Sequence, residues 1–416
     1  MTLTGDDGTP GVSSFDRKQV IHMPKTVNTD PDFFGFGELL TDQERSELAE
    51  IREVVQREIK PLANEAWDRA EFPFEAIRTF AKLGIAGFQF PEYGDGRTRR
   101  PLFTGFLSVE LNKADPSLAV ASGVHTGLAM GSIHGGGDQR QRDRWMPDMV
   151  AWNKIGAFGL TEPEGGSDVA GGMRTTARRE GDEWVLNGAK RWIGNGTFAD
   201  LVVVWARDEA DGQVKGFVVE KDTPGFHTSK IEGKIALRSV QNADITLDEV
   251  RVPEENRLQN IENFRDTAKV LAKTRGNVAW QALGVAVRAY ELARDYAVSR
   301  EQFGRPIAGF QMIQDLLVKM LGNITAMFGM VTRLAQKVED GTAGADHAAL
   351  AKSFTTTKMR ECVAWARELF GGNGIVLDYE VAKFFADAEA VYSFEGSREM
   401  NTLIVGKSIT GSSAFV

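Results

Sequence analysis

The chain contains a carboxylate placed where it can act as a general base. Glu395 lies in the segment FEGSREMNTLIVGK (394–407), directly before a predicted helix that Ser397 is placed to cap. Desolvation beside an apolar cleft raises the pKa of such a carboxylate, which suits it to remove a proton near neutral pH. An acid near a helix N-terminus is also common for dipole reasons alone, so this segment by itself leaves both interpretations open.

Two glycine-rich segments in the middle of the chain are suited to hold a flat or anionic ligand. GLTEPEGGSD (159–168) follows a predicted strand, and Thr161 and Ser167 place hydroxyls beside glycines that allow close backbone approach. In KRWIGNGTFAD (190–200), Trp192 stands beside a glycine-rich turn, where an indole can cover one face of an aromatic group. A polar loop between strands and a core tryptophan are the simpler interpretations.

Two segments nearer the C-terminus carry further anion-binding groups. In SREQFGRPI (299–307), Arg300 and Arg305 can pair with phosphates and Phe303 can pack against a ring. LFGGNGI (369–375) offers backbone amides to an anion or to the edge of a cofactor. A basic last helical turn and a helix C-cap explain the same residues without a ligand. The five histidines are not paired at metal-ligand spacing, so we expect no metal site.

The elements that must position these residues fall into three regions after an N-terminal arm, residues 1–35, which lacks periodicity. Residues 36–150 form a predicted N-terminal helical domain, in which Thr41 and Glu44 make a capping box and Pro61 ends the first helix. Further helices are expected near 75–83, 103–113, 116–131 and 138–150.

Residues 151–265 and 266–416 differ sharply in pattern. The first range contains short β-rich runs, divided by turn signals such as Asn187-Gly188, and predicts a middle antiparallel β domain. The runs are 155–160, 183–188, 200–206, 215–220, 226–231 and 243–250. The second range predicts a C-terminal four-helix bundle, with helices over 266–299, 313–338, 345–370 and 397–410. The predicted fold class is therefore α+β, mostly α.

Composition excludes several classes of function. Lys plus Arg number 49 against 58 Asp plus Glu, and a net charge of −9 disfavours a sequence-independent nucleic-acid binder. No segment approaches about 18 consecutive apolar residues, so no membrane span is expected. The N-terminus lacks signal-peptide features, the C-terminus SSAFV is not a peroxisomal address, and Cys362 has no partner for an intrachain disulfide. We therefore expect a cytoplasmic protein.

Together, the five motifs and the order of helices, strands and helices resemble the acyl-CoA dehydrogenase family over roughly residues 36–415. The resemblance implies an N-terminal helical domain, a middle β domain and a C-terminal four-helix domain that enclose FAD and an acyl-CoA. It implies FAD-dependent α,β-dehydrogenation of the thioester to a trans-2-enoyl-CoA. It also implies a homotetramer that passes electrons to an electron-transferring flavoprotein.

The resemblance assigns roles residue by residue. Glu395 matches the catalytic glutamate, whereas some relatives carry the base at the position of Thr274. Arg300, Gln302 and Phe303 match a segment that reaches the FAD of a neighbouring subunit. Substrate-binding residues by the same resemblance are Ser167, Arg275 and Gly396. The cofactor-binding residues that it implies are Phe158, Leu160, Thr161, Gly166, Ser167, Trp192, Ile193, Gly194, Arg300, Gln302, Phe303, Gln311, Gly371, Gly372, Asn373, Gly374, Ser397 and Glu399.

Within the family, the chain resembles glutaryl-CoA dehydrogenases and plant short-chain acyl-CoA oxidases most closely, with two departures. The segments that carry this resemblance are FADLVVVWAR, KGFVVEK, GNVAWQALG, GGNGI and FEGSREMNTLIVGKSITG. Ala119-Val120 stands where glutaryl-CoA enzymes hold the distal carboxylate with an Arg-Ser pair, and Asn112 replaces an acid, which disfavours a dicarboxylyl substrate. Gly194 replaces the threonine of the family's Trp-Ile-Thr, which leaves oxygen reactivity open. The alternatives are an oxidase, a glutaryl-CoA dehydrogenase, and a non-catalytic acyl-CoA-binding protein. Trp280 is interpreted either as narrowing the acyl tunnel or as helix packing.

Overall fold

The computed structural model describes residues 27–169 and 171–415, and residues 31–416 form one compact unit. Of the predicted arm, residues 1–26 lie outside the described part of the chain. None of the helices in the described part combines the length and the apolar character that a membrane crossing needs. The same residues contain no group of three or more His, Cys, Asp or Glu side chains that could hold a metal ion.

The N-terminal region is helical, as predicted. Its elements are η1 (Phe36–Leu39), α1 (Asp42–Val54), η2 (Val55–Ile59), α2 (Lys60–Arg69), α3 (Glu75–Leu83), η3 (Ile85–Phe88), η4 (Pro91–Tyr93), α4 (Pro101–Ala114), α5 (Pro116–Gly123), η5 (Val124–Met130), α6 (Gly131–Gly136) and α7 (Gln139–Val150). The capping box is present, because the amide of Glu44 donates to Oγ1 of Thr41 at 3.2 Å and the Thr41 amide donates to Oε2 of Glu44 at 2.8 Å.

One predicted boundary in this region is wrong. Pro61 does not end the first helix, because the chain passes through the π-helical turn η2 and continues as α2. Pro61 directly follows this π-helical turn, which interrupts the regular hydrogen-bond ladder where proline cannot donate.

The middle region folds into a seven-stranded sheet of β1 (Gly156–Gly159), β2 (Thr176–Glu180), β3 (Glu183–Ile193), β4 (Leu201–Asp208), β5 (Val214–Glu220), β6 (Phe226–Lys230) and β7 (Ala243–Pro253). The path β1-β4-β2-β3-β7-β6 carries β5 as an additional partner of β4. A short helix, η6 (Glu254–Asn256), follows. The sheet is mixed rather than antiparallel throughout, because β4 pairs in parallel with β1 and β2. Strand β4 is buried on both faces, which is typical of a strand with parallel neighbours.

The predicted turn at Asn187-Gly188 is also wrong, because both residues lie inside β3. The pairing of β3 with β7 shifts between Leu186 and Gly188, so the dipeptide marks a β-bulge. Gly188 has φ of +145°, and an added Cβ would lie 2.7 Å from the Cα of Thr175. Glycine is therefore required there by close backbone approach.

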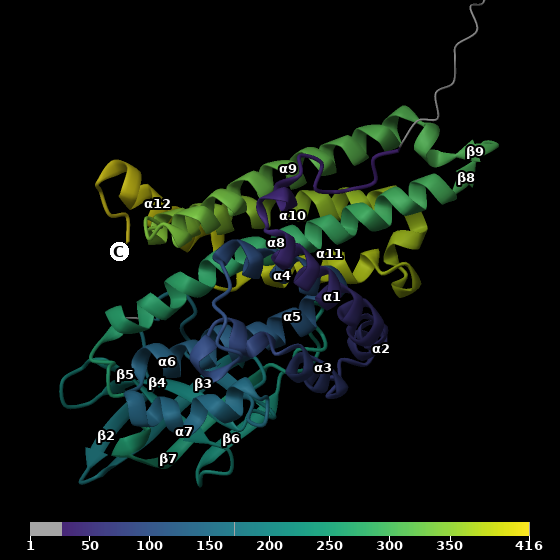
Figure 1. Cartoon of the computed structure of the whole chain (residues 1–416). Coiled ribbons are helices and arrows are strands. Elements are labelled where there is room, and N and C mark those ends of the chain that lie inside the picture. The colour runs from purple at the N-terminus through teal and green to yellow at the C-terminus, as the bar shows by residue number, and fades with distance from the viewer. Residues whose placement is uncertain (1–26, 170, 416) are drawn as a thin grey trace, which may run out of the picture. The chain divides into compact units, whose positions relative to one another are not determined.

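The C-terminal region consists of long helices, as predicted. Its elements are α8 (Phe264–Ser299), β8 (Glu301–Gln302), β9 (Arg305–Pro306), η7 (Ile307–Gly309), α9 (Gln311–Glu339), α10 (Ala345–Leu369), η8 (Gly371–Ile375), η9 (Leu377–Tyr379), α11 (Val381–Ser393) and α12 (Arg398–Thr410). Helices α8, α9, α10 and α11 run side by side, with the β8–β9 hairpin and α12 at opposite ends of the bundle (Figure 1). The sequence prediction missed α11, whose buried residues Val381, Phe384, Ala388 and Val391 recur at helical spacing.

Candidate active site

Glu395 lies in the short loop between α11 and α12, in an unusual backbone conformation. Its φ is +56° and that of Gly396 is +82°, so two consecutive residues are in the left-handed region. The predicted cap is confirmed, because Oγ of Ser397 accepts from the amide of Met400 at 3.3 Å. A left-handed glutamate costs on the order of 1–3 kcal/mol and persists only where its surroundings hold it.

The carbonyl oxygens of this loop are bound by side chains from three helices. Nζ of Lys352 on α10 donates to Tyr392 O at 2.7 Å and to Gly396 O at 2.8 Å. The side-chain amide of Asn401 on α12 donates to Gly396 O at 2.8 Å. From α8, Nε of Arg275 donates to Glu395 O at 3.4 Å. These donors fix the backbone on both sides of Glu395.

The carboxylate itself is tuned toward proton transfer near neutral pH. Burial raises the pKa of Glu395 to about 7, while Arg275, a hydrogen bond from Thr274 and the charge of Lys352 act in the opposite direction. Oγ1 of Thr274 donates to Oε2 of Glu395 at 3.3 Å. Burial also lowers the pKa of Arg275. The carboxylate is therefore available as a base at physiological pH without being strongly stabilised as an ion.

The loop of residues 160–169, which follows β1 and is called the Thr161 loop below, is attached to β3 by a buried ion pair. Nζ of Lys190 donates to Oε1 of Glu162 at 2.8 Å and to Leu160 O at 3.2 Å. Glu162 also accepts from the amides of Arg174 and Thr175, at 2.6 and 2.9 Å. Sequence reasoning missed Lys190 and Glu162, although a lysine within the strand NGAKRWI is a signal of a buried pair.

Trp192 presents its indole outward beside this loop. Its side chain is 52% exposed and its φ is +66°, so it is not a core tryptophan. The amide of Arg191 donates to Thr161 O at 2.8 Å, which joins the two glycine-rich segments. Phe158, Leu160 and Ile193 are buried beneath them. An exposed indole next to a loop with free backbone fits one face of a flat aromatic ring, so the residues present are compatible with FAD.

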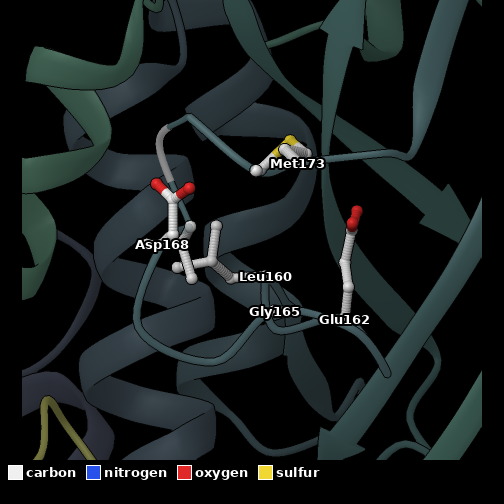
Figure 2. A pocket seen from close by; sticks show the side chains of 7 residues that line it. Leu160, Glu162, Gly165, Asp168 and Met173 are labelled. Atoms are coloured by element: carbon white, nitrogen blue, oxygen red, sulfur yellow. The ribbon is translucent and has the colours of Figure 1, made fainter. Parts of the chain in front are cut away.

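The rest of the Thr161 loop is open to ligands. Gly166 and Ser167 are exposed, and a Cβ added at Gly166 would meet no atom within 4 Å. Oδ1 of Asp168 accepts from the amide of Gly171 at 3.0 Å, which shapes the turn. Figure 2 shows the side chains of Asp168 and Glu162 on either side of Leu160 and Met173, and the hollow that these residues line is too small to hold a ligand.

The π-helical segment η5 packs against residues that adjoin both Glu395 and Trp192. The methyl group of Thr274 lies 3.5 Å from the position of a Cβ on Gly127, and Cγ2 of Val124 lies 3.0 Å from that of a Cβ on Gly194. Thr274, which contacts Glu395, and Gly194, which follows Trp192 by two positions, therefore pack against the same turn of η5. π-helical turns are frequent at functional sites, and sequence reasoning predicted only an ordinary helix there.

His125 anchors η5 to the sheet. Its Nδ1 accepts from the amide of Gly156 at 2.9 Å, and its Nε2 lies 2.9 Å from Met149 O, so the neutral tautomer with a proton on Nε2 satisfies both contacts. Burial lowers the pKa of His125 to about 4, which keeps the ring neutral. The contact fixes η5 against β1, directly before the Thr161 loop.

A second group of predicted residues lies at the other end of α8. Arg300 directly follows α8 and is 25 positions from Arg275, about 37 Å at 1.5 Å per residue. Phe303, at the tip of the β8–β9 hairpin, is 91% exposed and has φ of +52°. The members of this group are Arg300, Gln302, Phe303, Gln311, Gly371, Gly372, Asn373 and Gly374. The chain by itself does not bring them together with Trp192 and Glu395.

Part of this second group has a structural role. Gly371 is left-handed at the end of α10, and a Cβ at Gly374 would lie 2.3 Å from Arg367 O, so the helix-cap interpretation accounts for both. Nδ2 of Asn373 donates to the hydroxyl of Tyr296 at 3.0 Å.

The predicted cofactor residue Glu399 is not part of this second group. It lies near Glu395 on α12, is exposed, and pairs with Arg398 at 2.8 Å.

Three family models match successive parts of the chain. They are the acyl-CoA dehydrogenase N-terminal domain over residues 41–153, the middle domain over 157–250 and the C-terminal domain over 264–410. The chain belongs to the acyl-CoA dehydrogenase family. The resemblance inferred from the motifs is thereby confirmed, as is the enzyme class, an oxidoreductase acting on CH–CH groups.

Curated relatives support this membership. The chain is 33% identical over 365 residues to an acyl-CoA dehydrogenase of Bacillus subtilis, covering 87% of this chain and 96% of the relative. It is 31% identical over 363 residues to a short-chain-specific acyl-CoA dehydrogenase of Clostridium acetobutylicum, covering 86% and 96%.

Solved structures confirm the fold. A glutaryl-CoA dehydrogenase from Mycobacterium smegmatis aligns with a TM-score of 0.88 at 38% identity, covering 92% of this chain and 98% of that one. A glutaryl-CoA dehydrogenase from the same organism, in complex with FADH2, aligns with a TM-score of 0.89 at 33% identity and the same coverage. A chain in the structure of the electron-transferring flavoprotein of Acidaminococcus fermentans aligns with a TM-score of 0.85 at 30% identity, covering 90% and 99%.

Proposed function

We propose that the protein catalyses FAD-dependent α,β-dehydrogenation of a short to medium monocarboxylic acyl-CoA to a trans-2-enoyl-CoA, with Glu395 as the base. One observation carries the proposal: a half-buried, left-handed glutamate with a raised pKa contacts Thr274, and Thr274 packs on the same turn of η5 as Gly194, two residues after the exposed Trp192. A carboxylate with a perturbed pKa, carried by a loop whose carbonyls are bound from three helices, supports a functional role over a stabilising one.

The residues of the site have distinct tasks in this reaction. The Thr161 loop, Trp192 and Ile193 hold the isoalloxazine ring, and Ser167 serves the pyrophosphate or the pantetheine of the substrate. When bound, FAD supplies the acceptor for the hydride that leaves the β-carbon. Glu395 takes the α-proton on a carboxylate oxygen, and the electron pair of the broken C–H bond forms the double bond. A backbone amide beside Glu395 polarises the thioester carbonyl.

The substrate preference follows from the lack of charge where a second carboxylate would bind. Ala119 is an apolar buried residue of α5. Asn112 is buried on α4, its amide donates to Ser108 O at 2.8 Å, and a Cβ on Gly284 would lie 2.8 Å from its Cβ. Asn112 therefore packs α4 against α8. Burying an unpaired distal carboxylate is costly, so glutaryl-CoA is disfavoured despite the similarity to glutaryl-CoA dehydrogenases. A panel of acyl-CoA substrates with product analysis tests this preference.

We further propose a homotetramer that binds FAD at subunit interfaces and passes electrons to an electron-transferring flavoprotein. The separation of the second residue group from Glu395 supports the first part, and the aligned flavoprotein structure is consistent with the second. The alternative acceptor is oxygen, which the small residue Gly194 favours. One spectrum distinguishes them: the flavin is bleached by acyl-CoA under nitrogen and is then exposed to air. The cytoplasmic location stays a prediction.

The test of the proposed function is Glu395→Gln. This substitution keeps the shape of the side chain but removes the base, so flavin reduction by acyl-CoA should fall by about 100- to 10,000-fold. Bound FAD and the affinity for acyl-CoA should change little. The measurements are anaerobic stopped-flow absorbance and equilibrium binding.

The matched control is Glu389→Gln, which removes a partly exposed acid of α11 that pairs with Arg360 at 2.8 Å. We expect near wild-type reduction in this variant. A Glu395→Gln enzyme that keeps more than about a tenth of the wild-type rate contradicts the assignment, because that loss is below the range of general-base catalysis. If the wild-type protein binds acyl-CoA but its flavin is never bleached, the non-catalytic alternative is supported.

A further inference from the structure

Lys352 differs from the other fully buried lysines of this chain. Lys190, Lys352 and Lys383 are among the largest side chains with essentially no exposure. Lys190 pairs with Glu162 at 2.8 Å, and Lys383 pairs with Asp115 at 3.0 Å. The hydrogen bonds of Lys352 instead go to two backbone carbonyls, those of Tyr392 and Gly396. A buried cation without a carboxylate in direct contact is costly, so its retention calls for a compensating role.

The two carbonyls that Lys352 binds lie on either side of Glu395. Tyr392 is in the last turn of α11, and Gly396 directly follows Glu395. The ammonium group therefore spans the loop in which Glu395 and Gly396 are left-handed. Without this bridge, the loop could relax to ordinary backbone angles and redirect the carboxylate.

We propose that Lys352 is a positioning residue for Glu395. It fixes the loop through two carbonyls and, by its charge, favours the ionised carboxylate over the protonated one. The proposal rests on the proposed role of Glu395 as the base, and it adds a residue that touches neither substrate nor cofactor.

The charged groups around the loop are consistent with this role. Arg275 faces Glu395 from α8, Lys352 from α10, and Glu399 lies on α12. Burial lowers the pKa of Lys352 to about 8, and the charge of Glu395 opposes that shift. Each group thus stabilises the charged form of the other. Removing the charge of Lys352 leaves Arg275 as the remaining cation that opposes protonation of Glu395.

A purely structural interpretation makes different predictions. If Lys352 only capped the last carbonyls of α11, its replacement would lower stability and leave the proton affinity of Glu395 unchanged. A positioning role instead changes the rate of flavin reduction and its pH dependence. The two interpretations are therefore separable by experiment.

The test compares Lys352→Met and Lys352→Gln with wild-type holoenzyme. Methionine removes charge and donors, so flavin reduction at pH 7 should fall at least about tenfold, a loss typical of a misplaced base. The ascending limb of the rate–pH profile should move to higher pH by about one unit. The KM for acyl-CoA should change little. Glutamine keeps a donor for one carbonyl, so the Lys352→Gln variant should fold even if Lys352→Met does not. It should recover part of the reduction rate at high pH. Its rate–pH profile should keep the shifted ascending limb.

The matched control is Lys383→Gln, which removes another buried lysine that binds Asp115 and Asn64 away from the loop. It should lower thermal stability without moving the pH limb. This control separates the loss of a buried cation in general from the loss of this cation.

A second readout is independent of turnover. Infrared difference spectra report the protonated carboxyl of Glu395 as the band that is missing in Glu395→Gln. In Lys352→Gln this band should persist to higher pH than in the wild type. A shifted band in an enzyme that no acyl-CoA reduces would support the role of Lys352 while rejecting the proposed function. A folded Lys352→Gln enzyme whose reduction rate, pH limb and infrared titration all match the wild type overturns the proposal.

Discussion

The point in the site occupied by the Glu395 carboxylate can be reached by a side chain from either of two elements, α8 or the loop before α12. Oγ1 of Thr274 on α8 lies 3.3 Å from Oε2 of Glu395, which arrives from the loop before α12. A carboxylate carried by residue 274 would therefore reach nearly the same point. This geometry gives a physical reason why a base on either element serves the same reaction, and it makes Thr274→Glu a sensible rescue of Glu395→Gln.

The presence of glycine at position 194 is explained by the neighbouring side chain of Val124 rather than by a backbone conformation that only glycine adopts. Gly194 is absent from the glycines with left-handed φ, but a Cβ added there would lie 3.0 Å from Cγ2 of Val124. That distance is tighter than ordinary van der Waals contact. The side chain at position 124 and the glycine at position 194 are therefore matched in size, and the family's threonine does not fit without a change on η5.

We predict that Gly194→Thr lowers stability through this contact, whereas Gly194→Thr combined with Val124→Ala is tolerated. In the double variant, the restored hydroxyl adds a hydrogen bond of about 0.5–1.5 kcal/mol, so air reoxidation of the reduced flavin should slow by about two- to tenfold. Thermal unfolding and stopped-flow reoxidation measure the two effects. Val124→Ala alone is the control, and a double variant that reoxidises as fast as this control refutes the idea.

At the scale of elements, the Lys190–Glu162 pair fixes the Thr161 loop to β3. The pair is almost fully buried, and Glu162 also organises the backbone of residues 174 and 175. Trp192 follows Lys190 by two positions, so the same strand supplies both the anchor of the loop and the exposed indole. The pair thus sets the distance between the two segments expected to hold the flavin.

We predict that Lys190→Met destabilises the protein by about 3–5 kcal/mol, because it leaves a buried carboxylate without its cation. The purified variant should also lose most of its FAD. Chemical denaturation and the flavin-to-protein absorbance ratio are the measurements. Arg251→Met is the control: this β7 side chain is half-exposed and pairs with Glu180 at 2.9 Å, so its loss should cost no more than about 1 kcal/mol. Equal losses in the two variants would show that the buried pair has no special role.

The sequence predicted most helices and strands because their apolar spacing is local. The sequence predicted helix boundaries and irregular turns less well, because tertiary packing decides their conformation. The π-helical segments η2 and η5 carry no distinct periodicity, and propensity predicted a helix end at Pro61 although the π-helical turn before it accommodates the proline. In the site, Glu395 and Trp192 were found because they belong to motifs. Lys190, Glu162 and Lys352 were missed because charged residues are usually at the surface, and only the fold reveals their burial.

At the scale of the molecule, about 37 Å of α8 lies between Arg275, which contacts the Glu395 loop, and Arg300, which leads into the β8–β9 hairpin. Phe303 is 91% exposed, and the ring of Phe310 lies 6.0 Å away as its aromatic neighbour. A large apolar side chain held in a left-handed turn at the tip of a hairpin is well placed to enter another molecule. In a twofold assembly, each hairpin would then complete the site of the other subunit.

This arrangement predicts complementation between two inactive variants. Glu395→Gln removes the base but keeps the hairpin, whereas Gln302→Ala/Phe303→Asn keeps the base and removes the hairpin contacts; asparagine tolerates the left-handed turn. In a mixed dimer, the hairpin variant's own site has its base and receives the intact hairpin of the Glu395→Gln subunit. With random mixing, about a quarter of all sites should be complete, so refolding the two chains together should restore activity.

The control mixes Glu395→Gln with the triple variant that carries all three substitutions, in which no site has a base. Activity should then stay absent even though mixed assemblies form, as native mass spectrometry can verify. If mixed assemblies of the first pair form and remain inactive, the hairpin does not serve a partner's site. If the hairpin variant alone is fully active and saturated with FAD, the exposed Phe303 has another purpose. Only restoration in the first mixture supports a site shared between subunits, because neither chain in it is competent by itself.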